Sequence, residues 1–72
     1  MEIQKENGGA FITITGRFTF GLTDKQYSDI RLQKCPPSIG MGDKWLMSYH
    51  AMKMYIEPSE AQQLAELGCT II

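Results

Sequence analysis

In KWLMSYHAMKMYIEP, residues 44–58, nine of the fifteen side chains are apolar or aromatic, so the conformation of this segment governs the architecture of the domain. Its hydrophobic periodicity does not separate strand from helix. As a helix it aligns only Trp45, Tyr49, Met52 and Ile56. The aromatic content favours a pleated surface, so we predict one strand over residues 44–57, or two strands split near Ser48–Ala51. One continuous strand has an odd-numbered and an even-numbered face: Trp45, Met47, Tyr49, Ala51, Lys53 and Tyr55 against Leu46, Ser48, His50, Met52, Met54 and Ile56.

Directly after this stretch, YIEPSEAQQLAELGC, residues 55–69, predicts a helix. Pro58 suits the first helical position, and Glu60 lies in the first turn, where the helix dipole favours acidic side chains. Gly68 is the expected stop. The apolar face comprises Ala61, Leu64, Ala65, Gly68 and, beside them, Leu67. Residues 69–72 can add a short final strand.

The N-terminal residues, EIQKENGGAFITITG, predict a β-hairpin. Asn7-Gly8 is a strong turn signal, because a type I′ turn needs positive φ at both central positions. The second arm is long and alternates. One face carries Ala10, Ile12, Ile14, Gly16, Phe18 and Phe20, and the other carries Phe11, Thr13, Thr15, Arg17 and Thr19. Gly16, which has no side chain, is expected to mark a bend or bulge.

Residues 22–43 link the two apolar regions. Thr23 and Gln26 form a capping box, which favours a short helix. The competing interpretation is a strand over residues 29–34, since Ile30 and Leu32 alternate with charged residues. Residues 35–43, CPPSIGMGD, predict a loop, because two prolines and two glycines disfavour regular structure.

These elements predict a small α+β domain that spans residues 1–72. We expect one mostly antiparallel sheet, with the N-terminal hairpin, the long aromatic strand and one or two helices on a single face. A chain of this length has room for one domain and buries a thin core.

Composition excludes several classes of protein. The formal net charge of −1 gives no electrostatic reason to expect duplex DNA as a partner. No apolar run approaches the roughly 18 residues that a membrane span needs, and residues 1–9 lack the features of a signal peptide. Two cysteines are too few for a disulfide framework. We therefore expect a cytoplasmic protein with free thiols.

No pattern of catalytic or metal-binding residues is visible. His50 is the only histidine and has no neighbouring carboxylate or cysteine in metal-ligand spacing. Gly40 to Asp43, GMGD, lacks the remaining glycine, lysine and hydroxyl residue of phosphate-binding loops. The acidic residues Glu57, Glu60 and Glu66 are expected on a solvated helix face. The prediction is a protein that is not an enzyme and has no cofactor or metal.

The apolar strand is the feature that points to a function. One layer of helices covers one face of a small sheet, so the other face meets water or a partner. Aromatic and methionine side chains are typical of interface centres. We therefore predict a partner-binding surface of Trp45, Met47, Tyr49, Tyr55, Phe11 and Lys53, flanked by the loop at 36–43. The competing interpretation is that the long hairpin strand bends over and buries both faces.

The resulting hypothesis is a non-enzymatic protein-binding module that acts sterically as an inhibitor or adaptor. Proteins of this size without a catalytic site include those that phages and mobile elements direct at host enzymes or defence complexes. The partner is another protein, a second copy in a homodimer, or both. The alternative is a small regulatory or single-stranded nucleic-acid-binding protein, in which Trp45, Tyr49 and Tyr55 stack on bases beside Lys53. The net charge favours the protein partner.

Overall fold

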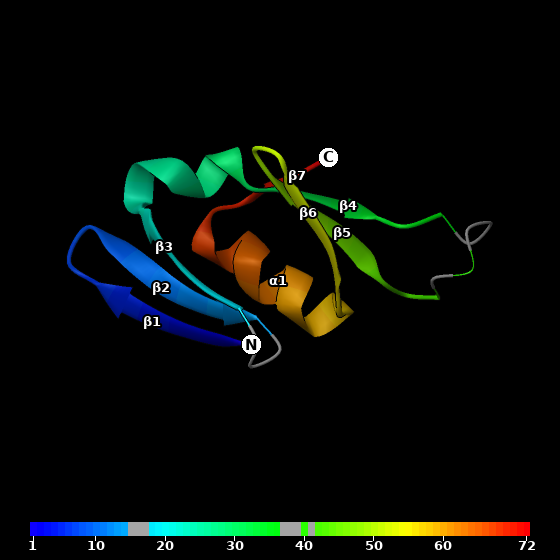
Figure 1. Ribbon diagram of the computed structural model, residues 1–72, viewed down its shortest axis with the longest axis horizontal. Helices are drawn as coiled ribbons and strands as arrows, with labels where there is room; N and C mark the ends of the chain where they lie inside the picture. The colour runs from blue at the N-terminus through cyan, green and yellow to red at the C-terminus, as the bar shows by residue number, and fades with distance from the viewer. Residues whose placement is uncertain (15–17, 37–39, 41) are drawn as a thin grey trace.

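A computed structural model describes residues 1–14, 18–36, 40 and 42–72 (Figure 1). The elements in chain order are β1 (Glu2–Glu6), β2 (Gly9–Ile14), β3 (Phe18–Thr23), the 3-10 helix η1 (Asp24–Asp29), β4 (Arg31–Lys34), β5 (Trp45–Tyr49), β6 (Met52–Ile56), α1 (Pro58–Leu67) and β7 (Thr70–Ile71). The molecule measures 41 × 23 × 22 Å along its principal axes. Its strands and its α-helix confirm an α+β architecture.

The strands form two sheets, which corrects the prediction of a single one. Sheet A has the order β1-β2-β3 and is antiparallel. Sheet B has the order β6-β5-β4-β7, and β7 runs parallel to β4. The chain leaves sheet A at Thr23, passes through η1 and begins the second sheet at Arg31. This detour separates the sheets, so the N-terminal hairpin does not join the aromatic strands.

The first hairpin forms where the sequence predicts it, with a different turn. Glu6 pairs with Gly9, so Asn7 and Gly8 make the two-residue loop. Among the described residues other than glycine, only His50 has positive φ, while Gly8 has φ 80°. Positive φ at the second central position alone is the pattern of a type II turn, not of type I′.

The predicted second arm is two strands. β2 and β3 are antiparallel, with Ile14 paired to Phe18 and Ile12 paired to Phe20. Antiparallel partners share a face, so the predicted grouping of these apolar side chains on one face is confirmed for the described residues. The predicted bend at Gly16 lies outside the described residues.

Residues 24–34 contain both predicted structures, one after the other: a short helix first and then a strand. η1 begins after Thr23, whose N–H donates to Gln26 Oε1 at 2.9 Å, as the capping box predicts. The chain becomes extended at Ile30, and β4 follows. Of the predicted loop at 35–43, residues 37–39 and 41 lie outside the described part.

Helix α1 begins at Pro58 and is followed by Gly68 with φ 129°, as predicted. The N–H groups of Gly68 and Cys69 both donate to the Leu64 carbonyl and close the last turn. Glu60 differs from its prediction, because it is 4% exposed. Its Oε1 accepts the Glu57 N–H at 2.9 Å, and its Oε2 lies 3.7 Å from the Met1 amino nitrogen.

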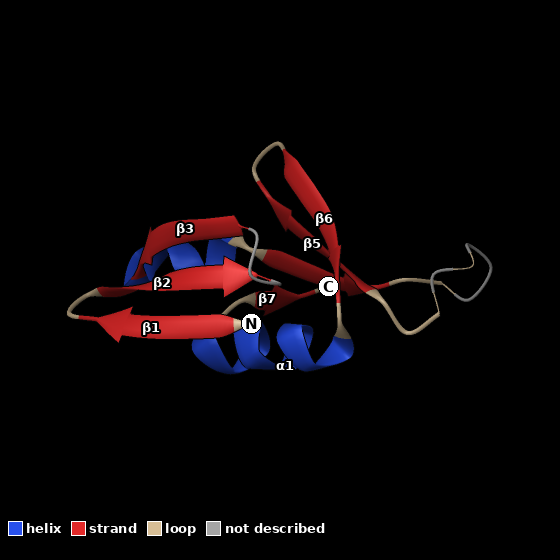
Figure 2. Ribbon diagram, turned by 60° about the horizontal axis from the view of Figure 1, so that its bottom comes forward, coloured by secondary structure: helices blue, strands red, loops and turns tan. Residues whose placement is uncertain are grey.

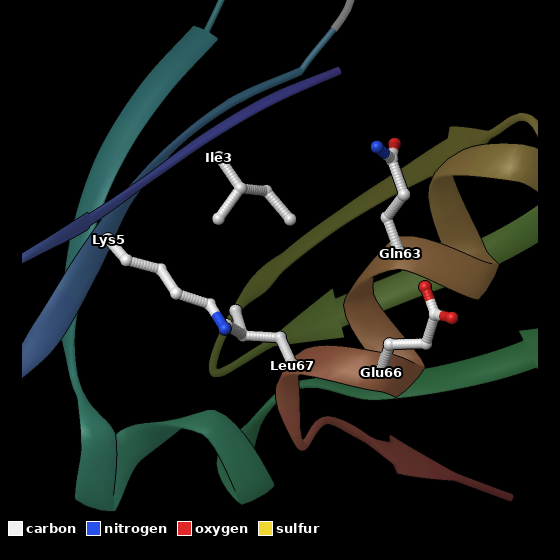
Figure 3. Close-up of a pocket in the computed structure, with 5 residues that line it drawn as sticks. All are labelled: Ile3, Lys5, Gln63, Glu66 and Leu67. Carbon is white, nitrogen blue, oxygen red and sulfur yellow. The ribbon is translucent and has the colours of Figure 1, made fainter.

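The core lies between the two sheets and α1 (Figure 2). α1 adjoins β1 on one side, where Ile3 and Lys5 face Gln63, Glu66 and Leu67 across a shallow pocket (Figure 3). The buried cluster draws on β2, β3, β4, β5, β6, α1 and the residues directly before β4 and β7: Ile12, Ile14, Leu22, Ile30, Leu32, Met47, Ile56, Ala61, Leu64 and Cys69. Within the described residues, no helix is long and apolar enough to cross a membrane.

Candidate functional site

The second hairpin fixes how the apolar stretch is divided. Residues 44–57 form two strands, which is one of the two arrangements that the sequence allows, with His50 and Ala51 as the loop. Tyr49 pairs with Met52, so an odd-numbered residue of β5 and an even-numbered residue of β6 share a face. Sheet B therefore presents Trp45, Met47, Tyr49, Met52, Met54 and Ile56 on its inner face, and Leu46, Ser48, Lys53 and Tyr55 on its outer face.

This arrangement corrects the prediction that one surface holds all six binding residues. Met47 is buried in the core, and Trp45 and Tyr49 are half-buried on the inner face. Lys53 and Tyr55 lie on the outer face, with 48% of Tyr55 exposed. The alternation expected of one continuous strand did not predict this division between two faces. A two-residue loop places the odd-numbered residues of the first strand on the same face as the even-numbered residues of the second.

Phe11 lies apart from the other five residues, on sheet A. It is 50% exposed and pairs with Gly21 across β2 and β3. A Cβ atom on Gly21 would lie 3.0 Å from Phe11 Cε1, so the ring covers the glycine. Aromatic side chains stabilise strand glycines in this way, and this packing accounts for the position of Phe11.

The loop of the second hairpin has an unusual residue. His50 has φ 54°, and positive φ at the first central position alone is typical of a type II′ turn, which favours glycine there. Its ring packs on Tyr49 with a centroid separation of 4.3 Å.

Replacing His50 with glycine is expected to stabilise the protein by roughly 0.5–1 kcal/mol, because glycine adopts positive φ without steric cost. Chemical denaturation measures the change. Ala51→Gly is the matched control and should destabilise, since Ala51 does not have positive φ. If His50→Gly and Ala51→Gly destabilise the protein equally, His50 does not occupy the turn position that requires positive φ.

A row of aromatic rings connects the two sheets. Phe18 and Phe20 of β3 lie 5.4 Å apart between ring centroids, and Phe20 stacks on Tyr49 of β5 at 6.3 Å. The row brings one edge of sheet A beside the hairpin of sheet B. α1 adjoins β1, at the other edge of sheet A.

Beside this row is a shallow apolar groove, widely open to solvent and of about 450 Å³, which we call the β3–β6 groove. Its lining residues are Phe18, Met52, Lys53 and Met54. Phe18 is 40% exposed and the two methionines are half-buried, so apolar surface meets solvent here. Lys53 supplies the only charge among these four side chains.

The groove runs between two strand edges. β3 ends the order of sheet A and β6 begins that of sheet B, so within the described residues each strand has a partner on one side only. In a two-residue hairpin, the pair of residues next to the loop is hydrogen-bonded. Along two antiparallel strands, hydrogen-bonded pairs then alternate with pairs that are not hydrogen-bonded to each other. On β6, the N–H and C=O groups of Met52, Met54 and Ile56 therefore point to β5, while those of Lys53 and Tyr55 point outward. Unpaired strand edges of this kind accept another strand.

The remaining reactive groups do not converge on this groove. Cys35 and Cys69 are buried free thiols, and burial raises the pKa of Cys69 to about 11. A thiol with so high a pKa is unreactive at neutral pH. Among the described residues, no three His, Cys, Asp or Glu side chains are grouped to hold a metal ion.

Comparison with protein-family models, with curated proteins and with solved structures found no match to this chain.

Proposed function

We propose that this protein is a small binding module that holds an extended segment of a partner protein in the β3–β6 groove. The observation that carries the proposal is the outward edge of β6 running along an apolar groove. Strand addition uses the same two features, since backbone hydrogen bonds supply affinity and side-chain pockets supply specificity. By holding this segment, the module would sterically block the partner, as an inhibitor does, or recruit it, as an adaptor does.

The chemistry of the edge specifies the segment. A strand added to β6 places alternate side chains over Met52 and Met54, and the others beside Lys53 and Tyr55. Apolar residues suit the positions over Met52 and Met54. Within the described residues, Lys53 has no ion pair, so an acidic residue suits the position beside it. The proposed partner segment thus alternates apolar residues with polar ones that include an acidic side chain.

The alternative of single-stranded nucleic-acid binding stays a prediction with weaker support. It required Trp45, Tyr49 and Tyr55 on one face. Trp45 and Tyr49 instead lie on the inner face of sheet B, away from Tyr55 and Lys53. Of these three rings, only Tyr55 is exposed on the outer face, so the predicted set provides one stacking platform there.

Selection from a displayed library of random peptides tests the proposal directly. We expect the peptides that bind to alternate apolar residues, with an acidic residue on the opposite face. Met54→Glu should weaken their binding at least tenfold, because it buries a charge against apolar partner residues. Gln62→Glu adds the same charge on the exposed face of α1 and should leave binding unchanged.

Two outcomes would contradict the proposal. The first is a set of selected peptides that bind the Met54→Glu protein as tightly as the unmodified one. The second is a protein that elutes at twice 8.1 kDa and becomes monomeric on Met54→Glu. That result would assign the groove to a second copy of the chain, not to a partner's segment.

A further inference from the structure

The two methionines of the β3–β6 groove lie at the rim of the core. Met54 pairs with Met47 across β5 and β6, so the two side chains share the inner face of sheet B. Met47 is on a strand with neighbours on both sides and is 0% exposed. Met54 and Met52 are on β6, which within the described residues is the edge of its sheet, and both are half-buried. Two thioether side chains therefore line the open groove, while a third, directly opposite Met54, is shielded from solvent.

A thioether that solvent can reach reacts with peroxides. The sulfur attacks one oxygen of hydrogen peroxide, an S–O bond forms and the O–O bond breaks. The proton on the transferred oxygen passes to the departing hydroxide, so the products are methionine sulfoxide and water. The sulfur loses two electrons and the peroxide gains two. A flexible apolar side chain thereby becomes a polar one.

The groove is sensitive to such a change, because Lys53 is the only polar residue among the four that line it. The proposed partner segment places its own apolar residues over Met52 and Met54. A sulfoxide oxygen at either position accepts hydrogen bonds from water, and these are lost when an apolar side chain covers it. We infer that Met52 and Met54 are modification sites, at which oxidation by a peroxide switches off binding of the partner segment. This inference rests on the proposed function of the groove.

Peptide mapping by mass spectrometry, after timed exposure of the folded protein to hydrogen peroxide, tests whether the two sites react. Met52 and Met54 should be oxidised about tenfold faster than Met47, or more, because susceptibility follows exposure. Met47 is the internal control, since it differs from Met54 in burial and not in chemistry. Oxidation of all three residues at the same rate, in a protein that keeps its circular dichroism spectrum, would overturn the inference.

Peptide affinity, measured before and after the same treatment, tests the consequence for binding. A selected peptide should bind the oxidised protein about tenfold more weakly, or worse. The matched control is the double variant Met52→Leu/Met54→Leu, which keeps apolar side chains of similar volume and lacks both sulfurs. Its affinity for the peptide should be the same before and after peroxide. Methionine sulfoxide reductases should restore binding to the oxidised unmodified protein.

The inference is overturned if the oxidised protein binds the peptide as tightly as the reduced one. It is also overturned if the double variant loses affinity to the same extent, because oxidation elsewhere in the chain would then explain the loss. A reduced protein that binds no selected peptide would contradict the proposed function and, with it, this inference. The reduced sample therefore separates a failure of the proposed function from a failure of the oxidation switch alone.

Discussion

Replacing Gly9 with alanine is expected to destabilise the protein by roughly 3–5 kcal/mol, a large part of the stability of a domain this small. A Cβ atom at this position would lie 2.2 Å from the Leu22 carbonyl oxygen. Relieving that overlap separates β2 from β3 at the Ala10–Leu22 pair, both of whose side chains are buried. Urea denaturation, followed by Trp45 fluorescence or circular dichroism, measures the change.

The neighbouring glycine provides the control. Gly8 has φ 80°, and a Cβ atom there would meet nothing within 4 Å. Asparagine tolerates positive φ, so Gly8→Asn should cost about 1 kcal/mol or less. Equal losses for the two variants would show that backbone conformation, not the close approach of β3, requires the pair of glycines.

Leu64→Ala is the second substitution with a large expected effect. Leu64 is fully buried in the cluster that joins α1 to both sheets. Truncating a buried leucine removes its transfer free energy and leaves a cavity, so we expect a loss of about 2–5 kcal/mol. A thermal or urea melt measures it.

Gln62→Ala, on the exposed face of α1, is the matched control. It should change stability by less than about 0.5 kcal/mol. A Leu64→Ala protein that melts with the unmodified one would remove α1 from the core and, with it, the support for the inner face of sheet B.

Local chemistry explains which elements the sequence predicted correctly. The Asn7-Gly8 turn, the cap of Thr23 and Gln26, and the helix between Pro58 and Gly68 each depend on residues within a few positions of one another. The division into two sheets is different, because it depends on which distant strands pair. Nothing local to Thr23 or Arg31 specifies that choice.

The two apolar stretches show how loop length controls the prediction of faces. Three residues separate Ile14 from Phe18, so odd and even positions keep their faces although the chain reverses. Two residues separate Tyr49 from Met52, so the faces exchange. His50-Ala51 is not a recognisable turn pair, and the burial of Met47 and Ile56 fixes the reversal instead.

The candidate site was therefore only partly predictable. The sequence predicted one strand or two strands over residues 44–57, and the structure has two, β5 and β6. The groove also needs Phe18, which belongs to sheet A and comes beside β6 only through packing of the two sheets.

Amide hydrogen exchange along β6, measured in the free protein and with a selected peptide bound, shows whether this strand edge binds a partner segment. In the free protein, the amides of Lys53 and Tyr55 should exchange fast, and those of Met54 and Ile56 slowly, because only the latter are bonded to β5. Peptide binding should slow exchange at Lys53 and Tyr55. If these two amides are already protected in a monomeric free protein, or stay unprotected in the complex, the edge of β6 is not the binding site.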